Sequence, residues 1–346
     1  MKKELKLHKY FPLIRSREEV LSDISSKRRL QLEYEQWTKE QQDEFLDVCT
    51  GAKGVKIVSD PFFKEIFNPE YTPERLDELL SVLLKQRVKV LHVLPNDSVR
   101  LTSEGSLLIT DLVVELEDGS IVNVEVQRIG YMFPGERAAC YSADLLLRQY
   151  KRVRDKWGKA FSYKSVKPVY TIVLFENSPE SFHDYPEDYI HRAEAKSNTG
   201  LEMELLQKFI FIPLDIFKKT SQNKPIKNKM EAWLTFLSSD EPERIIELIS
   251  SYPEFKPMYD NIYELCRNIE GVMNMFSEEL YILDRNTELY MMDEMQKEID
   301  EKKKALSELN AQLDEQTKQL DEQTKQLDEK DALIEQLQAK LKAVEV

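Results

Sequence analysis

The chain is poor in cysteine, histidine and glycine. Its three cysteines, Cys49, Cys140 and Cys266, are far apart and form no Cys-x-x-Cys pair, which argues against a disulfide framework and a zinc knuckle. Its four histidines are not spaced as metal ligands or as an HNH-type site. Only 9 glycines in 346 residues, together with 32% charged residues, favour an α/β protein with extra helices over an all-β protein.

Long apolar runs are also missing from the sequence. The N-terminal residues are partly basic but contain no apolar stretch of signal-peptide length, and no segment approaches the roughly 20 apolar residues of a membrane span. We therefore expect a cytoplasmic protein with no membrane partner. A hydrophobic content of 41% is enough to form a substantial core.

Charge is distributed unevenly along the chain. The net charge of −14 by itself argues against a nucleic-acid partner, because phosphate binding depends on Lys and Arg. The tail, residues 291–346, is acidic, whereas residues 137–170 contain nine Lys and Arg against two acids, Asp144 and Asp155. This basic stretch is either a solvated helix face or a surface that follows a phosphate backbone.

Apolar periodicity predicts the order of the elements. Residues 17–50 have apolar positions at helical spacing and indicate one or two amphipathic helices. Further helices are expected from Asp60, from Pro73, over 135–157 and over 229–285. Short apolar runs predict strands over 88–94, 106–116, 120–127, 167–176 and 208–215. The central order is therefore helix, three strands, helix, strand.

The tail carries a heptad repeat. The sequence LDEQTKQ occurs twice in tandem, at 313–319 and 320–326. Position a is apolar throughout, at Leu306, Leu313, Leu320, Leu327, Ile334 and Leu341, whereas position d holds Leu309, Gln316, Gln323, Lys330, Leu337 and Val344. The pattern predicts a coiled coil that joins copies of the chain, with a long solvated single helix as the alternative. The polar d positions leave the oligomeric state open.

The strands on either side of Glu117-Asp118-Gly119 form a predicted hairpin with two possible registers. A two-residue Asp-Gly loop would mix polar and apolar side chains on both faces. A three-residue loop with a left-handed Gly119 instead pairs Leu112 with Val124 and makes one face nearly continuously apolar. The same register places Asp111 opposite Glu125 on the other face, together with Gln127. Burial alone therefore selects the register that brings the two acids together.

Two carboxylates and a neighbouring amide suit a hard divalent cation. Mg²⁺ and Mn²⁺ prefer oxygen ligands, and a bound ion of this kind polarises a phosphate and activates a water molecule for hydrolysis. The competing interpretation is that Asp111 and Glu125 are ordinary acids on the exposed face of a half-buried hairpin.

Several short motifs in order resemble the PD-(D/E)xK nuclease family transposases, a group related to recombination-promoting nucleases. The resemblance runs from Asp60 to about Asp215. Its motifs are Asp60-x-x-Phe63-Lys64-x-x-Phe67, Thr110-Asp111-Leu112 with the acidic hairpin, Val124-Glu125-Val126-Gln127, and Arg137-x-x-x-Tyr141. No single motif is specific, but their order and spacing together are more so.

The resemblance implies a restriction-endonuclease-like core and assigns roles to its residues. Asp111 and Glu125 would be metal ligands. Asp60 or Glu65 would add a carboxylate from the first helix, with a helix cap as the alternative role of Asp60. Gln127 stands where the family signature has lysine, and Thr110 where it has proline. Glutamine contributes a dipole and not a cation near the attacking water, so the departure puts catalysis in doubt, although this subfamily usually carries glutamine there.

The following helix is implied to contact DNA. Arg137 and Tyr141 are four residues apart, hence on one helix face, where Arg137 could approach a phosphate and Tyr141 could stack or hydrogen-bond. Packing of an amphipathic helix is the alternative. The remaining residues expected at the nucleic acid are Arg148, Lys151 and Arg152.

The sequence predicts four segments and one leading function. The segments are an N-terminal helical extension (1–55), a nuclease-like domain (56–220), a helical region (221–290) and the coiled coil (291–346). The leading function is a Mg²⁺- or Mn²⁺-dependent DNA endonuclease associated with a mobile element, recombination or defence. The alternative is a catalytically degenerate nuclease fold that binds nucleic acid or protein and is assembled by its coiled coil.

Overall fold

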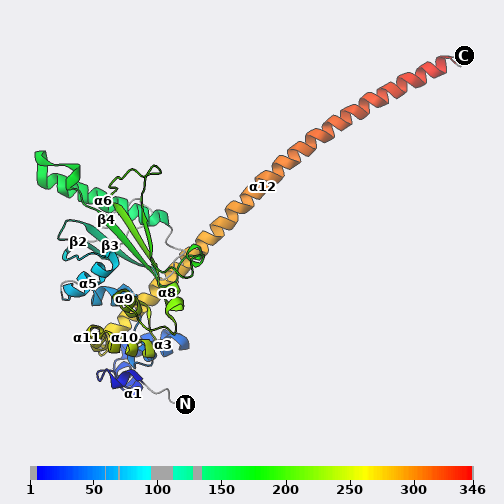
Figure 1. Ribbon diagram of the computed structural model, residues 1–346. Coiled ribbons are helices and arrows are strands. Elements are labelled where there is room, and N and C mark those ends of the chain that lie inside the picture. Colours follow the sequence, from blue (N-terminus) through cyan, green and yellow to red (C-terminus); the bar gives the residue numbers. More distant parts are fainter. Residues whose placement is uncertain (1–5, 59, 69–70, 95–111, 128–134, 345–346) are drawn as a thin grey trace. The chain divides into compact units, whose positions relative to one another are not determined.

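The computed structural model describes residues 6–344 apart from 59, 69–70, 95–111 and 128–134 (Figure 1). The chain divides into two compact units, residues 1–283 and 284–346. The larger unit has one main hydrophobic core that draws side chains from as far apart as Leu7 and Met273. Segment boundaries at residues 55 and 220 stay a prediction, because the segments on both sides of each contribute to this core.

Three helices follow the short 3-10 helix η1 (Lys6–Lys9) at the N-terminus. They are α1 (Arg17–Ser26), α2 (Arg28–Gln36) and α3 (Lys39–Cys49). The expectation of one or two helices was wrong, because the backbone is extended at Lys27, Trp37 and Thr38. Thr38 then opens α3 with a capping box, in which its hydroxyl accepts from the backbone N–H of Gln41 and the Gln41 side chain accepts from that of Thr38.

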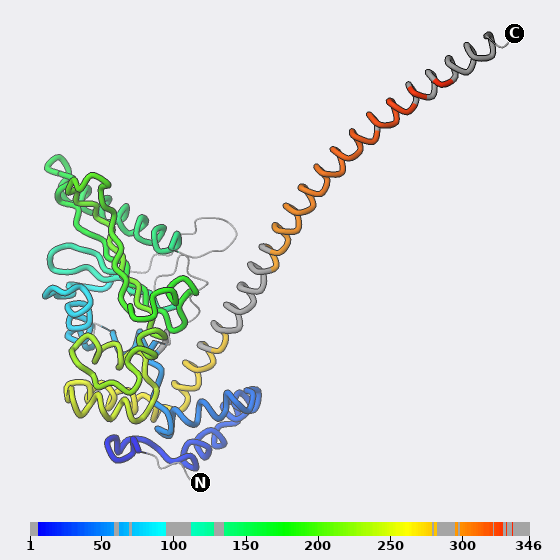
Figure 2. The backbone as a smooth tube through the Cα atoms, turned by 45° about the vertical axis from the view of Figure 1, so that its right-hand side comes forward, coloured from blue at the N-terminus to red at the C-terminus, as the bar shows by residue number. Residues whose placement is uncertain are grey.

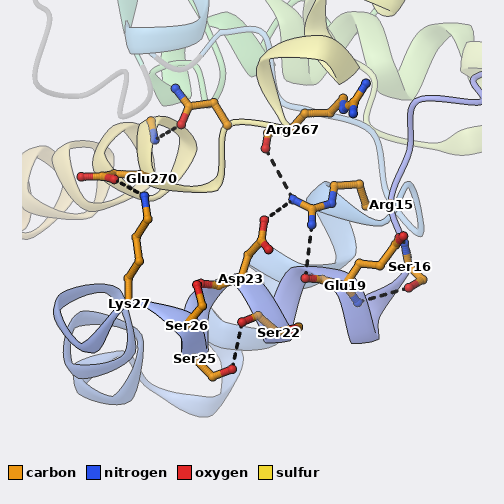
Figure 3. Close-up of polar contacts among 12 residues, drawn as sticks. Arg15, Ser16, Glu19, Ser22, Asp23, Ser25, Ser26, Lys27, Arg267 and Glu270 are labelled. Atoms are coloured by element: carbon orange, nitrogen blue, oxygen red, sulfur yellow. Dashed lines mark hydrogen bonds and ion pairs between the residues drawn. The ribbon is translucent and has the colours of Figure 1, made fainter.

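Polar contacts tie these helices to the end of the same unit (Figure 3). The Arg15 guanidinium donates to Oδ2 of Asp23 at 2.7 Å and to the carbonyl of Arg267 at 3.5 Å. Lys27 donates to Oε2 of Glu270 at 2.7 Å. The Arg15 hydrogen bond lowers the pKa of Asp23, and the Lys27 hydrogen bond lowers the pKa of Glu270. Two segments about 250 residues apart in the chain are therefore joined by charge-assisted hydrogen bonds.

The next two helices begin where the sequence predicts. Helix α4 spans Asp60–Ile66 with Pro61 in its first turn, and α5 spans Pro73–Leu84. Leu76, Leu79, Leu80 and Leu83 of α5 are buried in the main core. The motif aromatics Phe63 and Phe67 are each 1% exposed, with ring centroids 4.7 Å apart. Both aromatic residues therefore act in packing.

A six-stranded mixed sheet forms the centre of the larger unit. Its strands are β1 (Val90–Val93), β2 (Leu112–Leu116), β3 (Ile121–Gln127), β4 (Val169–Phe175), β5 (His191–Glu194) and β6 (Gln207–Pro213), in the order β1-β2-β3-β4-β6-β5. Neighbours β3, β4 and β6 are parallel, and the other pairs are antiparallel. Five strands match predicted segments. Strand β5 was missed because it is a short, largely exposed edge strand with the sequence HRAE.

The hairpin has the register that apolar burial selects. Leu112 pairs with Val124 and Val114 with Val122, and Gly119 adopts a left-handed conformation with φ +84°. The loop is closed by a hydrogen bond from the backbone N–H of Gly119 to the carbonyl of Leu116 at 2.9 Å. The three-residue loop is thus confirmed for the part of the hairpin that the structure describes.

Helices cover both faces of the sheet (Figure 1). On one face, Val114, Val122 and Val124 pack in the main core with the α5 leucines and with Phe217 of α8 (Leu214–Ser221). On the other face lies α6 (Gly135–Trp157), whose Ala138, Tyr141 and Leu145 pack on β3 and β4. Helices α9 (Lys229–Ser238), α10 (Pro242–Ser251) and α11 (Lys256–Leu265) complete the main core, and α7 (Glu180–His183) follows β4. Strand β3 is therefore enclosed on both sides.

The last helix, α12, spans Ile269–Val344. Its first residues, among them Ile269, Val272 and Met273, belong to the main core of the larger unit. In residues 284–346 the heptad leucines whose side chains the structure describes are exposed, with Leu313 52% and Leu320 64% accessible in the single chain. The structure confirms a long helix here, and its assembly into a coiled coil stays a prediction. No helix in the described part of the chain is both long and apolar enough to cross a membrane.

Candidate functional site

Glu125 lies at the centre of the candidate site and is almost completely buried. Its side chain is 1% exposed because β3 is an inner strand and α6 covers the face toward which Glu125 points. Oε1 of Glu125 accepts a 2.9 Å hydrogen bond from Nδ2 of Asn123, which is itself 0% exposed. Burying a carboxylate is costly unless polar groups compensate it, so the two side chains form one polar unit inside the sheet.

Further polar side chains accompany this pair beneath α6. Thr171 of β4 pairs with Asn123 in the parallel β3–β4 ladder, and Ser142 lies on the buried side of α6. Oδ1 of Asn123, Oγ1 of Thr171 and Oγ of Ser142 are buried and have no hydrogen-bond partner among the described residues. None of these three residues belongs to a motif of the sequence. The available signal was a polar residue inside an otherwise apolar strand, as in IVNVEV and VYTIVLF.

Gln127 ends β3 at an accessible edge of the sheet. It pairs with Phe175, the last residue of β4, and is partly exposed. Its carbonyl accepts a 2.8 Å hydrogen bond from the backbone N–H of Glu176. Because β3 and β4 are parallel, Gln127 and Glu176 lie at the same edge. Lys56 brings a cation there, 3.8 Å from Oε1 of Glu176, and it belongs to none of the motifs of the sequence.

The predicted helical pair of Arg137 and Tyr141 is in direct contact. Nε of Arg137 donates to the Tyr141 hydroxyl at 2.7 Å, and the guanidinium carbon lies 5.3 Å from the centre of the ring. The Tyr141 ring is 1% exposed and packs with Val173 and Phe175. Stacking of Tyr141 on a base is thus precluded by burial, and its hydroxyl orients Arg137, which is partly exposed at the start of α6.

The three other basic residues of α6 that are expected at the nucleic acid differ in their surroundings. Arg148 pairs with Asp144 at 2.8 Å, Arg152 pairs with Glu115 of β2 at 3.3 Å, and Lys151 is exposed. Gln149 is 2% exposed, donates to the carbonyl of Gly119 and accepts from the backbone N–H of Lys167, each at 2.8–2.9 Å. Gln149 therefore joins the hairpin loop to the start of β4 and is a structural residue.

Two expected metal ligands fall outside what the structure describes. Asp111 directly precedes β2 and lies outside the described residues, and Asp60 begins α4 but its side chain is not described. Among the described side chains, no three His, Cys, Asp or Glu residues come together as a metal site would require. The donors that are described, the Glu125 carboxylate and the buried Oδ1 of Asn123, are oxygens, which is the chemistry that a hard cation such as Mg²⁺ accepts.

One comparison with known proteins identifies a family. The family model for PD-(D/E)XK nuclease family transposases matches residues 57–292, about two thirds of the chain. The six-stranded mixed sheet with helices on both faces is consistent with the fold of that family. Searches of curated proteins and of solved structures returned no match. The chain therefore belongs to the PD-(D/E)XK nuclease family transposases.

Proposed function

We propose that this protein is a metal-dependent DNA endonuclease that hydrolyses phosphodiester bonds at the edge of the sheet where β3 ends. Membership of the family supports a nuclease- or transposase-associated function with a nucleic-acid substrate, and nucleases of this superfamily generally use divalent metal ions. The DNA substrate, the metal and the individual residues are part of the proposal.

The observation that carries the proposal is the β2–β3 register combined with the burial of Glu125. Leu112 pairs with Val124, so a ladder continued by one residue would pair Asp111 with Glu125. Glu125 is held by Asn123 in a water-poor environment, 1% exposed, two residues before the end of β3. In such an environment a carboxylate interacts with a cation more strongly than it does in water.

Each residue of the site has a specific role in this proposal. Asp111 and Glu125, with Asp60 as a further candidate, would hold a Mg²⁺ or Mn²⁺ ion. When bound, the ion would polarise the scissile phosphate and lower the pKa of a water molecule. Gln127 would orient the attacking water or the phosphate through its amide, and Arg137, oriented by Tyr141, would contact a phosphate oxygen.

A non-catalytic alternative is supported by one specific observation. Gln127 replaces the lysine of the family signature, so the residue at the end of β3 carries no positive charge. A degenerate nuclease fold would bind nucleic acid or protein without cleaving it. The two functions differ in whether a divalent ion is needed and in whether phosphodiester bonds are broken.

Nicking of supercoiled plasmid in the presence of Mg²⁺ or Mn²⁺ tests the proposal. The wild type is compared with Asp111→Asn and Glu125→Gln, which remove one negative charge each at nearly constant shape. We expect both substitutions to lower the nicking rate at least 100-fold, whereas equal rates in all three proteins would refute the site. A wild type that never nicks DNA would favour the binding module.

A matched control lies in the same hairpin. Glu117 in the loop is an exposed acid that pairs with Lys89 at 3.5 Å, so Glu117→Gln removes the same charge from the same hairpin without reaching the site. This variant should nick DNA at the wild-type rate. Calorimetric titration with Mn²⁺ adds a readout independent of cleavage, in which the Asp111 and Glu125 variants should bind the ion more weakly than the control does.

A further inference from the structure

An aromatic cluster lies at the far end of α6 from Arg137. Tyr150 of α6 stacks on Tyr163 of the 3-10 helix η4 (Tyr163–Ser165), with ring centroids 5.9 Å apart and an interplanar angle of 12°. Phe161 meets both rings edge-on, at 5.4 Å from Tyr150 and 5.2 Å from Tyr163. Trp157, the last residue of α6, precedes the 3-10 helix η3 (Gly158–Ala160).

Two of these four aromatic residues are largely open to solvent. Tyr163 is 75% exposed and Trp157 is 53% exposed, whereas Tyr150 and Phe161 are partly buried. The ring contact between Tyr150 and Phe161 has a structural role, because it joins α6 to the segment that leads from α6 to β4. That structural role leaves the rings of Tyr163 and Trp157 accessible, and exposed aromatic faces are available for stacking with a base.

Basic residues lie next to these rings along the chain. Lys156, Lys159 and Lys164 are exposed and form no ion pair with any residue that the structure describes. Arg154 donates to the Tyr150 hydroxyl at 2.8 Å, and its guanidinium carbon lies 5.9 Å from the ring centre. Between residues 150 and 167 the single acid is Asp155. We call Tyr150, Trp157, Phe161, Tyr163, Lys156, Lys159 and Lys164 the aromatic–basic surface.

This surface is separate from the candidate site. Tyr150 follows Arg137 by 13 residues on the same helix, a separation of about 20 Å at the rise of an α-helix. Figures 1 and 2 both show the end of α6 and the following turn extending beyond the strands of the sheet. A DNA strand that passes along α6 would therefore reach the aromatic–basic surface several nucleotides away from the bond at the end of β3.

We propose that the aromatic–basic surface binds an unpaired stretch of DNA, with bases stacked on Tyr163 and Trp157 and phosphates contacted by Lys156, Lys159 and Lys164. Exposed rings favour a single strand over a duplex, because the faces of paired bases are already stacked on their neighbours. The three lysines between and beside these aromatic residues attract phosphate locally, although the chain as a whole has a net charge of −14. This inference rests on the proposed function only in taking DNA as the substrate.

Fluorescence anisotropy of labelled oligonucleotides in EDTA tests the inference without requiring cleavage. The probes are a single-stranded 20-mer and the matching duplex, and the full chain is compared with Tyr163→Ala and Tyr163→Phe. We expect Tyr163→Ala to weaken single-strand binding roughly tenfold, Tyr163→Phe to bind like the wild type, and the duplex to be much less affected by either change. If Tyr163→Ala binds the single strand as tightly as the wild type does, the inference is overturned.

A matched aromatic control and a direct optical readout accompany this experiment. Tyr281→Ala removes a tyrosine that is 65% exposed on α12 and should leave single-strand binding unchanged. Single-stranded DNA should also quench tryptophan fluorescence, and Trp157→Phe should abolish most of that change because Trp233 is buried and Trp37 is partly buried. Quenching that survives in Trp157→Phe would contradict the proposed stacking.

Failure of the inference and failure of the proposed function give different results. A wild type that nicks plasmid while Tyr163→Ala keeps full affinity for the single strand would reject the aromatic–basic surface alone. A wild type that never nicks DNA but binds the single strand through Tyr163 would reject the nuclease and retain the surface.

Discussion

Nδ2 of Asn123 donates a 2.9 Å hydrogen bond to Oε1 of Glu125, which lies two residues further along β3. Both side chains are buried beneath α6. Residues i and i+2 of a strand point to the same face, so the amide and the carboxylate are neighbours by virtue of the strand itself. Because the face is covered, the carboxylate depends on protein groups for the hydrogen bonds that water would otherwise provide.

Removing the Asn123 amide is therefore expected to destabilise the fold. Asn123→Ala deprives a buried carboxylate of a hydrogen bond, which costs about 1–3 kcal/mol of the free energy of unfolding. Urea denaturation at pH 7 measures the loss. Asn274→Ala removes an exposed amide that accepts from Arg29 at 3.1 Å and should stay within about 0.5 kcal/mol of the wild type. Equal loss in the two variants would contradict a special role for Asn123.

Gln127 is expected to affect the rate of cleavage more than the binding of DNA. Loss of one dipole directed at the charge that develops in a reaction lowers its rate about 100- to 1,000-fold, so Gln127→Ala should nick plasmid at least about 100-fold more slowly under the proposed function. DNA affinity in EDTA should be unchanged. Gln207→Ala alters a glutamine at the start of β6 and serves as the control. A rate unchanged by Gln127→Ala would remove this residue from the site.

Lys229 links three elements and makes part of the stability depend on pH. It donates to Glu254, lies 2.5 Å from Oε1 of Glu78 on α5, and its ammonium group is 5.2 Å from the centre of the Phe255 ring. The hydrogen bond from Lys229 lowers the pKa of Glu254. A carboxyl whose pKa is lowered on folding stabilises the fold above its unfolded pKa of about 4.3 and loses this effect as the pH falls through its folded pKa.

Lys229→Met should accordingly be less stable than the wild type at pH 7, and the difference should shrink at pH 3. The three side chains are partly exposed, so the difference at pH 7 should be below about 1 kcal/mol per ion pair. Urea denaturation at the two pH values provides the comparison, with Lys227→Met as the matched control. A difference that is the same at both pH values would show that packing of the Lys229 side chain dominates.

The exposed seam of α12 is expected to join copies of the chain. Sedimentation of the full chain should give the mass of an oligomer, and removal of residues 291–346 should lower it to the monomer. Leu313→Glu with Leu320→Glu places charge at two a positions and should have the same effect. Lys318→Glu with Lys325→Glu changes charge on the opposite side of the helix. A full-length chain that sediments as a monomer would favour a solvated single helix.

Local patterns determined several features of this protein in advance. The hairpin register followed from the alternation of apolar residues around Gly119, since a slip of one residue would turn the apolar side chains of β2 away from the core. The starts of α4 and α5 followed from Asp60 and Pro73. These rules act within a few residues of the chain, so the sequence is sufficient to apply them.

Tertiary structure alone decided which surfaces are covered. The strand alternation placed Glu125 and Asn123 on one face, but the packing of α6 decided that this face is buried and that the Tyr141 ring cannot stack on a base. The pairing of β5 with β6 and the meeting of Tyr150 with Tyr163 also depend on segments that fold back from a distance. Burial of a side chain is set by whichever distant element packs on it, and this information lies in the whole chain and not in any one motif.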